Sequence, residues 1–334
     1  MSGDSGGDTG GGSGGHAGGG SSGGSSRGSG GLPRLTFCLT VGMDALSLWI
    51  TSFRSTNASM ISRGEMEVPG THRVLELLDR YDIRSTFLVP GHTALAYPDL
   101  IREIVDRGHE LAYHGWMHED AREFDVAGQR RIIERGLEAL DLVAGVRPRG
   151  HVSPAWNMSE HTIELIEEFG FEFDGSRMAT DMMPVYVRKG DRWLTDGAYQ
   201  FGELTDIVGI PVAWPMDDVP IFEFVWGQIP GLAPPSVAEE MWTGEFDYAY
   251  DHCPGGVYHL TIHPQVIGRG SRLTMLERVV RRAAERSDVV FSRQSEYVDA
   301  WRALNPREQW RAQNPELAGD GSIRVLPSMA DTGE

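Results

Sequence analysis

The sequence is poor in cysteine, in positive charge and in long apolar runs, and each shortage excludes a class of protein. Only two of its 334 residues are cysteines. Two cysteines cannot make the disulfide framework of a small secreted domain, and such low usage suits a reducing compartment. We expect Cys38 and Cys253 to be packing residues rather than ligands.

The charge balance is strongly negative. Lysine and arginine together number 30 against 48 aspartates and glutamates, which gives a formal net charge of -18. Nucleic acids and anionic membranes are bound through clustered Lys and Arg, so neither is an expected partner. A neutral or cationic small substrate fits this balance better. A homo-oligomer is compatible with the sequence, although no segment specifies an interface.

No run reaches the ~18 apolar residues of a membrane-spanning helix, and the N-terminus lacks the basic start and apolar stretch of a secretory signal. We therefore expect a cytoplasmic protein. Residues 1–31 are nearly all Gly and Ser, which is typical of a flexible tail. Residues 305–334 are polar and interrupted by Pro and Gly, so a second flexible tail is expected there. Residues 32–304 remain as one catalytic domain of α/β-barrel size.

Between the tails, short apolar runs alternate with helical patterns. Residues 35–41 (LTFCLTV) form a continuous apolar run that predicts a strand buried on both faces. Strands are also expected at 85–89, 110–113, 151–156, 171–174, 207–212, 257–262 and 289–291, and helices at 68–81, 98–107, 127–144, 159–169, 272–285 and 295–303. Residues 45–63 are expected to form a loop. This alternation indicates an α/β barrel, whose reactive groups gather where the strands end.

Polar side chains follow two of these strands. Asp44 comes just after the first strand, while His114 and His118 follow the strand at 110–113. The four-residue spacing predicts a turn of helical backbone with both imidazoles on one face. Two histidines and one aspartate can hold a divalent cation that keeps a position open for water and substrate. Such a cation polarises carbonyl groups and activates water, so the pattern predicts hydrolysis.

Further candidates are expected at the same rim. His263 follows the strand at 257–262, and its ordinary pKa near neutrality suits a general acid that protonates a leaving amine. Asp217 or Asp218 can hold that ring in position. The candidates for binding the substrate are His151, Trp156 and Trp214 at the same rim, together with Glu65. Each has a structural alternative, because strand-end aspartates often form turns and tryptophans often pack in cores.

Five segments make the chain resemble the polysaccharide deacetylases with a NodB homology domain, most closely their peptidoglycan deacetylase and cyclic imide hydrolase-like branch. They are LTVGMDA (39–45), HGWMH (114–118), HVSPAW (151–156), PVAWPMDD (211–218) and LTIHP (260–264). The resemblance implies a distorted (β/α) barrel of about seven strands. It also implies that Asp44, His114 and His118 bind a metal, usually zinc, and that His263 is the general acid. The segment of Trp214 and the adjacent acidic pair would line the pocket and orient that acid.

The chain departs from the family pattern at two positions. The first segment resembles F-D-x-D, whose first Asp is the base that activates water, but Gly42 stands there. The third segment usually supplies an Arg that tunes this base, but Val152 stands there. Three interpretations are open: a surrogate base such as His151 or Glu65, an easier substrate, or a catalytically silent protein that keeps the barrel. The expected substrates are an N-acetyl amino sugar or a similar amide, and alternatively a small cyclic imide or ureide.

Overall fold

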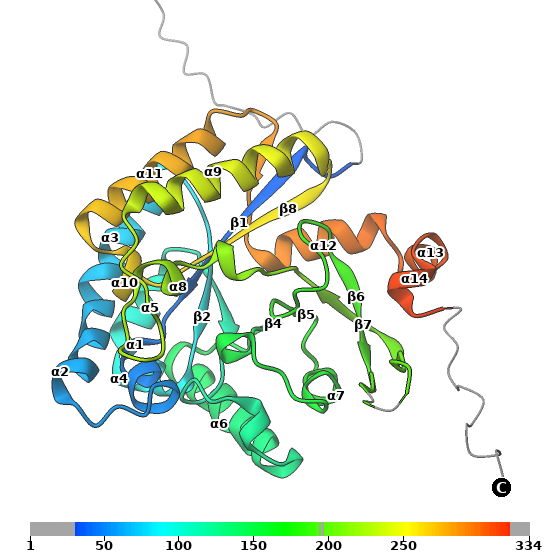
Figure 1. The fold of residues 1–334 in the computed structure, drawn as a ribbon, viewed down its shortest axis with the longest axis horizontal. Helices are drawn as coiled ribbons and strands as arrows, with labels where there is room; N and C mark the ends of the chain where they lie inside the picture. The colour runs from blue at the N-terminus through cyan, green and yellow to red at the C-terminus, as the bar shows by residue number, and fades with distance from the viewer. Residues whose placement is uncertain (1–30, 194, 196, 321–334) are drawn as a thin grey trace, which may run out of the picture. The chain divides into compact units, whose positions relative to one another are not determined.

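The fold is an α/β half-barrel around a curled, mostly parallel sheet (Figure 1). The computed structural model describes residues 31–193, 195 and 197–320. The strands are β1 (Leu35–Gly42), β2 (Thr86–Val89), β3 (Glu110–Tyr113), β4 (Gly150–His151), β5 (Phe173–Asp174), β6 (Val185–Lys189), β7 (Glu203–Gly209), β8 (Gly256–Ile262) and β9 (Val289–Phe291). Their order is β6-β7-β5-β4-β3-β2-β1-β8, and β9 pairs with β1.

The seven strands from β7 to β8 along this order run parallel, and β6 is antiparallel to β7. This confirms the expected α/β fold, a distorted barrel of about seven strands. Within the described residues no pairing joins β6 to β8, so the sheet is curled rather than closed.

Helices connect and cover the strands. They are α1 (Ala45–Ser47), α2 (Ala58–Ile61), α3 (Glu67–Arg80), α4 (Gly91–Ala96), α5 (Pro98–Asp106), α6 (Val126–Ala144), α7 (Thr162–Glu168), α8 (Asp218–Phe222), α9 (Pro235–His252), α10 (Pro264–Ile267), α11 (Gly270–Ala284), α12 (Gln294–Leu304), α13 (Arg307–Gln313) and α14 (Pro315–Ala318). Shorter turns are η1 (Leu48–Ser52, of π type), η2 (Ser62–Met66), η3 (Ala121–Glu123), η4 (Pro154–Trp156) and η5 (Trp214–Met216). In the part of the chain that the structure describes, no helix has the length and apolar character needed to cross a bilayer.

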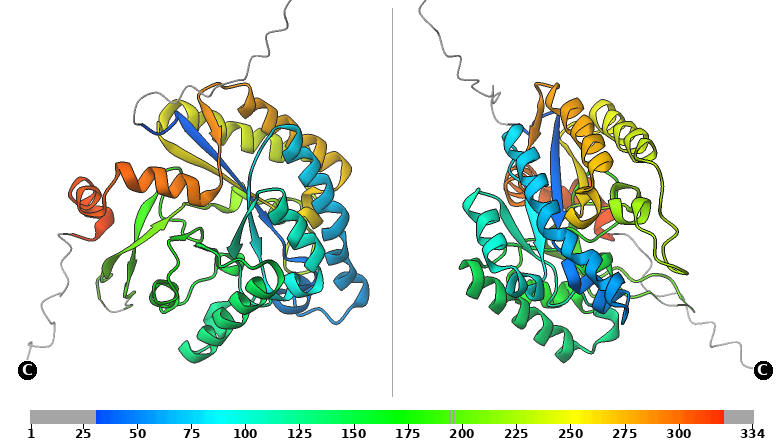
Figure 2. Two further views of the ribbon diagram at one scale, coloured as in Figure 1. Left: turned by 180° about the vertical axis from the view of Figure 1, so that it is seen from behind. Right: turned by 90° about the vertical axis from the view of Figure 1, so that its left-hand side faces the viewer.

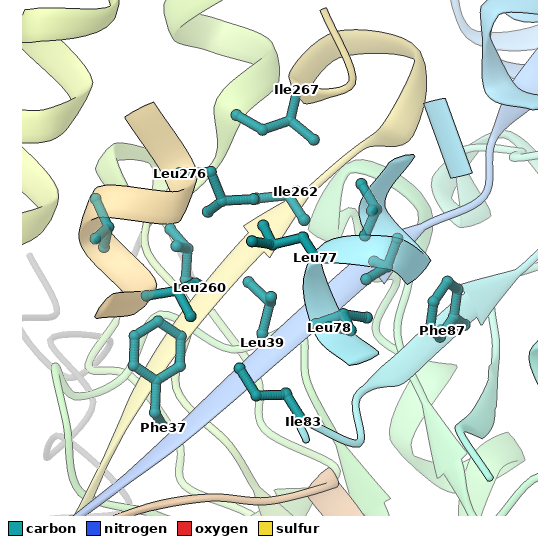
Figure 3. Close-up of a cluster of buried hydrophobic side chains, with 14 of the residues drawn as sticks. Phe37, Leu39, Leu77, Leu78, Ile83, Phe87, Leu260, Ile262, Ile267 and Leu276 are labelled. Atoms are coloured by element: carbon teal, nitrogen blue, oxygen red, sulfur yellow. The ribbon is translucent and has the colours of Figure 1, made fainter. Parts of the chain in front are cut away.

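The main hydrophobic core lies between β1, β8 and the helices packed on their outer face (Figures 1 and 3). Phe37 and Leu39 of β1 meet Leu77 of α3 and Leu276 of α11 in this layer. Every second residue of β1 faces this core, because side chains alternate across a strand. The residues in between face the concave side, where the candidate site lies.

At one end of the concave side α12 lies across the sheet (Figure 1 and the left view of Figure 2). Cys38 of β1 packs there with Tyr297 and Trp301 of α12. Thr40 comes two residues after Cys38 on β1, and its hydroxyl oxygen lies 3.1 Å from Nε2 of His259. A polar layer therefore separates the apolar packing of α12 from the end of β1.

The structure corrects the expected boundary of the C-terminal tail. Residues 307–318 form α13 and α14 instead of beginning a flexible tail. The reason is Trp310, which is 4% exposed and packs its ring 5.5 Å from that of Tyr186 on β6. The rest of the expected tail, residues 321–334, and residues 1–30 of the N-terminal one lie outside the described residues.

Several expected elements also change in detail. The 151–156 segment continues β4 for one residue and then forms η4, because the strand pairs for only two residues. Residues 45–63 carry α1, η1, α2 and the start of η2 rather than an irregular loop. The antiparallel strand β6 and the long helix α9 were not predicted.

Candidate metal and catalytic site

The period of two along β1 and β8 brings the candidate residues to one place. Thr40 pairs with Thr261 in the parallel register of these strands. Gly42 and His263 come two residues after Thr40 and Thr261, so they are neighbours on the concave face. Asp44 follows Gly42 by another two residues.

Asp44, His114 and His118 form a compact buried cluster. Nε2 of His114 lies 3.5 Å from Oδ1 of Asp44, and Nε2 of His118 lies 3.5 Å from Oδ2. The three residues are only 1, 3 and 4% exposed, in the same order. One possible ligand atom from each lies within 4.8 Å of the others. The structure thus brings together the three side chains that the sequence assigned to one cation.

Hydrogen bonds at Nδ1 orient both imidazoles so that their Nε2 atoms point toward Asp44. Nδ1 of His114 lies 2.7 Å from the carbonyl oxygen of Val152, which can only accept, so Nδ1 carries the proton. The hydroxyl of Ser52 donates to the carbonyl oxygen of His118 at 3.0 Å, and its oxygen accepts from Nδ1 of the same residue at 2.6 Å. Both Nε2 atoms therefore present lone pairs toward Asp44, as a metal ligand must.

The charges of the cluster agree with this arrangement. Burial, followed by the neighbouring His118, lowers the pKa of His114 to about 3, so its ring stays neutral. Burial opposes ionisation of Asp44, but His118 and then His263 outweigh it and lower the pKa of this carboxyl. Its Oδ1 has no hydrogen-bond donor among the described residues. A buried carboxylate oxygen without a donor, beside two imidazole lone pairs, fits a divalent cation such as zinc.

The backbone between the two histidines forms a tight turn, not the expected turn of helix. Gly115 has φ 78° and His118 has φ 60°, both in the left-handed region. Oε2 of Glu119 accepts from the backbone N–H groups of Trp116 and Met117 at 3.1 and 2.8 Å. These two bonds close the turn and bring His118 back beside His114.

Asp44 sits at a strained bend that several groups support. Ala45, the next residue, has φ 48°, which is costly for a residue with a Cβ. Its N–H donates to Oε2 of the fully buried Glu67 at 3.0 Å. Burial, and then the nearby Asp44, raises the pKa of Glu67 well above its usual range, while the bond from Ala45 acts the other way. The carbonyl oxygen of Asp44 accepts from the hydroxyls of Ser47 and Thr93.

His263 is held by two acidic residues at the start of α8, Asp217 at its N-cap and Asp218 as its first residue. Oδ1 of Asp218 accepts from Nδ1 of His263 at 2.7 Å, and Oδ2 accepts from the backbone N–H of the same residue at 2.9 Å. Oδ1 of Asp217 lies 3.9 Å from Nδ1. Nε2 of the ring faces inward, 3.5 Å from Oδ2 of Asp44. Burial opposes a charge on this ring, but Asp217, Asp218 and Asp44 outweigh it and raise its pKa well above the ordinary value.

The ring of His263 occupies the space beside Gly42. A Cβ added at position 42 would lie 2.5 Å from Nε2 of His263, closer than packed atoms approach. The imidazole therefore stands where a longer side chain at position 42 would begin. The glycine has a stereochemical reason that the sequence alone did not reveal.

The two candidate tryptophans lie together. The rings of Trp156 and Trp214 have centroids 4.6 Å apart. Ala155 and Trp156 both have positive φ, 49° and 52°, so this aromatic pair is held by strained backbone. Trp156 is buried with Val152 beside the sheet, whereas Trp214 is 44% exposed. Trp214 is therefore the member of the pair that solvent reaches.

His151 and Glu65 are not brought to the cluster. His151 stacks on Tyr113, and its Nδ1 donates to Oδ1 of the fully buried Asp174 at 2.8 Å. Tyr113 belongs to the cluster of side chains beneath α6 and α7, so the ring of His151 faces away from Asp44. Glu65 is exposed on η2. The positions of His151 and Glu65 therefore do not support a role for these residues as a surrogate base.

Four residues that shape the site were not predicted: Ser52, Glu67, Thr93 and Glu119. Glu119 directly follows the second histidine, and its place in the sequence was the one available signal. The others lie in segments remote from the histidines, and their contacts depend on the folded chain.

Comparisons with known proteins agree with this geometry. The polysaccharide deacetylase family model matches residues 63–173, which include both histidines of the cluster. A peptidoglycan deacetylase of Helicobacter pylori is 31% identical over 287 residues, covering 80% of this chain and 97% of that protein. The chain belongs to the polysaccharide deacetylase family. This membership agrees with the half-barrel fold described above.

Two solved structures are similar to this deacetylase-family chain. A Mycobacterium smegmatis protein assigned to the polysaccharide deacetylases superposes with a TM-score of 0.73 at 32% identity, covering 82% of this chain and 92% of that one. An allantoinase superposes with a TM-score of 0.68 at 23% identity over the same shares of the two chains. The second likeness concerns the fold alone.

Proposed function

We propose that this protein is a metal-dependent hydrolase of non-peptide carbon–nitrogen bonds, which deacylates an amide such as an N-acetyl amino sugar. One observation carries the proposal: Nε2 atoms of His114, His118 and His263 each lie 3.5 Å from the carboxylate of Asp44. Membership of the deacetylase family supports this class of reaction.

Asp44, His114 and His118 would hold the cation, with zinc as the expected metal. When bound there, a divalent cation supplies Lewis acidity that polarises a carbonyl group and activates water. The chain contributes ligands that are already oriented. Val152 and Ser52 fix the two rings, and the bend at Ala45 fixes the carboxylate.

His263 is proposed as the proton donor to the leaving nitrogen. Oδ1 of Asp218 accepts a hydrogen bond from Nδ1 of His263, so Nε2 is the ring atom that faces the reacting groups. The surrounding carboxylates favour the charged ring, so Nε2–H donates as the carbon–nitrogen bond breaks. The next water molecule to enter the site gives up a proton to this neutral ring before it attacks the following amide, so the ring is charged again when that carbon–nitrogen bond breaks. The imidazole ends each turnover as it began, and amide plus water gives amine plus carboxylic acid.

Gly42 bears on the substrate. With His263 over position 42, one imidazole performs the proton transfers that the family otherwise divides between a carboxylate and a histidine. We therefore expect slow hydrolysis of ordinary amides. A small cyclic imide or ureide, whose leaving nitrogen is better stabilised, is the second candidate substrate class. A catalytically inactive protein is the third interpretation. Gly42 supports it, whereas the oriented metal ligands and the hydrogen bond between His263 and Asp218 argue against it.

The test is hydrolysis of an N-acetylglucosamine oligomer and of succinimide, each with added zinc or cobalt and with chelator. We expect turnover that chelator abolishes. His263→Asn should retain zinc and lose ~10²- to 10⁴-fold in kcat. His114→Ala should lose the metal, and His252→Ala, at an exposed histidine of α9, should change neither.

Two outcomes would contradict the proposal. Failure of the purified protein to bind zinc or cobalt would remove the metal site. Stoichiometric zinc without turnover of either substrate would favour the silent interpretation.

A further inference from the structure

We propose that Ser52 is a positioning residue that holds the ring of His118 in the tautomer and orientation a cation requires. The inference rests on the proposed function, because it concerns the cation site of Asp44, His114 and His118. It begins from an unusual pair of contacts: one hydroxyl oxygen lies 2.6 Å from Nδ1 of His118 and 3.0 Å from its carbonyl oxygen.

The direction of these two hydrogen bonds follows from counting hydrogens. A serine hydroxyl has one hydrogen, and the carbonyl oxygen of His118 can only accept it. The hydroxyl oxygen is then left to accept from Nδ1, so the proton of the neutral ring resides on Nδ1. The lone pair is thereby forced onto Nε2, the atom that lies 3.5 Å from Asp44.

His118 needs this support more than His114 does. Nδ1 of His114 bonds to the backbone of Val152, which belongs to the turn that follows β4. His118 stands at the end of a tight turn in the left-handed region, with φ 60°. Glu119 fixes that turn only through the N–H groups of Trp116 and Met117. The hydroxyl of Ser52 holds both the carbonyl group and the ring of His118.

The segment that carries Ser52 is itself anchored to the site. η1 is a π-type turn closed by the N–H of Phe53 to the carbonyl of Leu48 at 3.1 Å. Its Trp49 is 1% exposed and donates from Nε1 to Oε1 of Gln265 at 2.8 Å. Gln265 comes two residues after His263. The turn that carries Ser52 is thus anchored to the segment that follows His263, the proposed general acid. π-type turns are frequent at functional sites.

Ser52 lies at the exposed rim of the site, so its loss opens the ring of His118 to water. Water can donate to Nδ1 as well as accept from it, and the preference for the Nδ1–H tautomer is then lost. Loss of such a partner of a metal-binding histidine typically lowers metal affinity about 10- to 100-fold.

The first measurement is zinc affinity by competition with a chelating dye, for the full chain and for Ser52→Ala, Ser52→Thr and Ser62→Ala. We expect Ser52→Ala to bind zinc about 10- to 100-fold more weakly, and Ser52→Thr to retain affinity because it keeps the hydroxyl. Ser62→Ala removes an exposed serine hydroxyl from the neighbouring η2 and should change nothing. Equal affinity of Ser52→Ala and the natural protein would overturn the inference.

The second measurement is the tautomer of His118 in the metal-free protein, read from the ¹⁵N shifts of its ring by NMR. We expect Nδ1–H in the natural protein and in Ser52→Thr, and a mixture in Ser52→Ala. If the natural protein binds no zinc, the metal assignment fails, but this readout still decides on Ser52. An Nε2–H ring in the natural protein would overturn the role of Ser52 whatever the metal affinity.

Discussion

At the scale of single residues, the site depends on the absence of a side chain at Gly42 and on the ring of His263, which fills that space. Gly42 leaves room for the ring of His263, and the two acidic residues behind that ring hold it there. A residue with a Cβ cannot occupy position 42 while the imidazole keeps this position. The glycine and the histidine are therefore one structural unit.

This coupling makes a prediction for position 42. Gly42→Ala places a Cβ 2.5 Å from Nε2 of His263, so the ring must turn away from Asp218. We expect kcat to fall about 10²-fold, since proton transfer is lost, and the free energy of unfolding to drop by about 1–3 kcal/mol. Gly42→Asp meets the same clash and should not restore a base.

Steady-state kinetics and urea unfolding check this, with Gly244→Ala as control. Gly244 lies on α9, and an added Cβ there meets nothing within 4 Å. A gain of activity in Gly42→Asp would show that His263 can move aside and that a carboxylate base still fits.

Glu67 allows a second prediction at this scale. Its buried carboxyl group accepts from the N–H of Ala45 at 3.0 Å. Glu67→Gln keeps an acceptor of the same shape, whereas Glu67→Ala leaves a buried donor unpaired. We expect urea unfolding to give a loss of about 1–3 kcal/mol for Ala relative to Gln. Equal stability of the two variants would mean that this hydrogen bond does not support the bend after Asp44.

At the scale of elements, the C-terminal helices complete the edge of the sheet. Trp310 of α13 packs on Tyr186 of the edge strand β6, in a cluster that includes Trp301 of α12. α14 adds a buried Ala318 to the same cluster. A chain ending at Asn305 would leave β6 without this cover.

Removing the Trp310 ring tests whether these helices belong to the folded domain. We expect Trp310→Ala to cost about 3–5 kcal/mol of unfolding free energy, because a buried indole leaves a cavity. Trp226→Ala is the matched control, since Trp226 is 86% exposed. If both variants unfold at the same urea concentration, α13 contributes no stability.

The sequence predicted the elements whose burial is total and local. β1 is an unbroken apolar run because both of its faces are covered, and β3 was predicted at its observed bounds. α9 was missed because only a narrow stripe of it is buried, at Ala238, Trp242, Phe246 and Ala249. β6 was missed because its place is decided by antiparallel pairing with β7 and by the cover of α13.

The site divides in the same way. Asp44, His114 and His263 were predictable because each comes just after a parallel strand, and parallel strands of known direction all end at one edge of the sheet. Ser52 was not, because it meets His118 across 66 residues of sequence. His151 was placed at the rim because it lies near a strand end, but its register opposite Tyr113 turns it to the outer face.

At the scale of the folded unit, the concave side of the sheet is layered by polarity. Apolar packing of α12 lies at one end, and the cluster around Asp44 lies at the other. Between them, His259 donates from Nδ1 to the carbonyl oxygen of Pro211 at 3.0 Å and lies 3.1 Å from the hydroxyl of Thr40. Gln294, the first residue of α12, also reaches Nε2 of His259, at 3.2 Å. This layer links the sheet to α12 through a neutral imidazole.

That neutral imidazole predicts how stability depends on pH. Burial lowers the pKa of His259 from 6.5 to about 4 in the folded protein, although its bond to Pro211 acts the other way. Between these values the unfolded chain binds a proton that the folded protein does not, so stability is full above pH 6.5 and falls as the pH drops toward 4. His259→Gln removes this titration but keeps an amide able to donate and accept. We expect urea unfolding to show the natural protein losing about 3 kcal/mol more than the variant between pH 7 and pH 4, because all other titrating groups are shared. Parallel stability curves for the two proteins would mean that the pKa of His259 is the same in the folded and the unfolded chain, so that burial in the polar layer does not disfavour the charged ring.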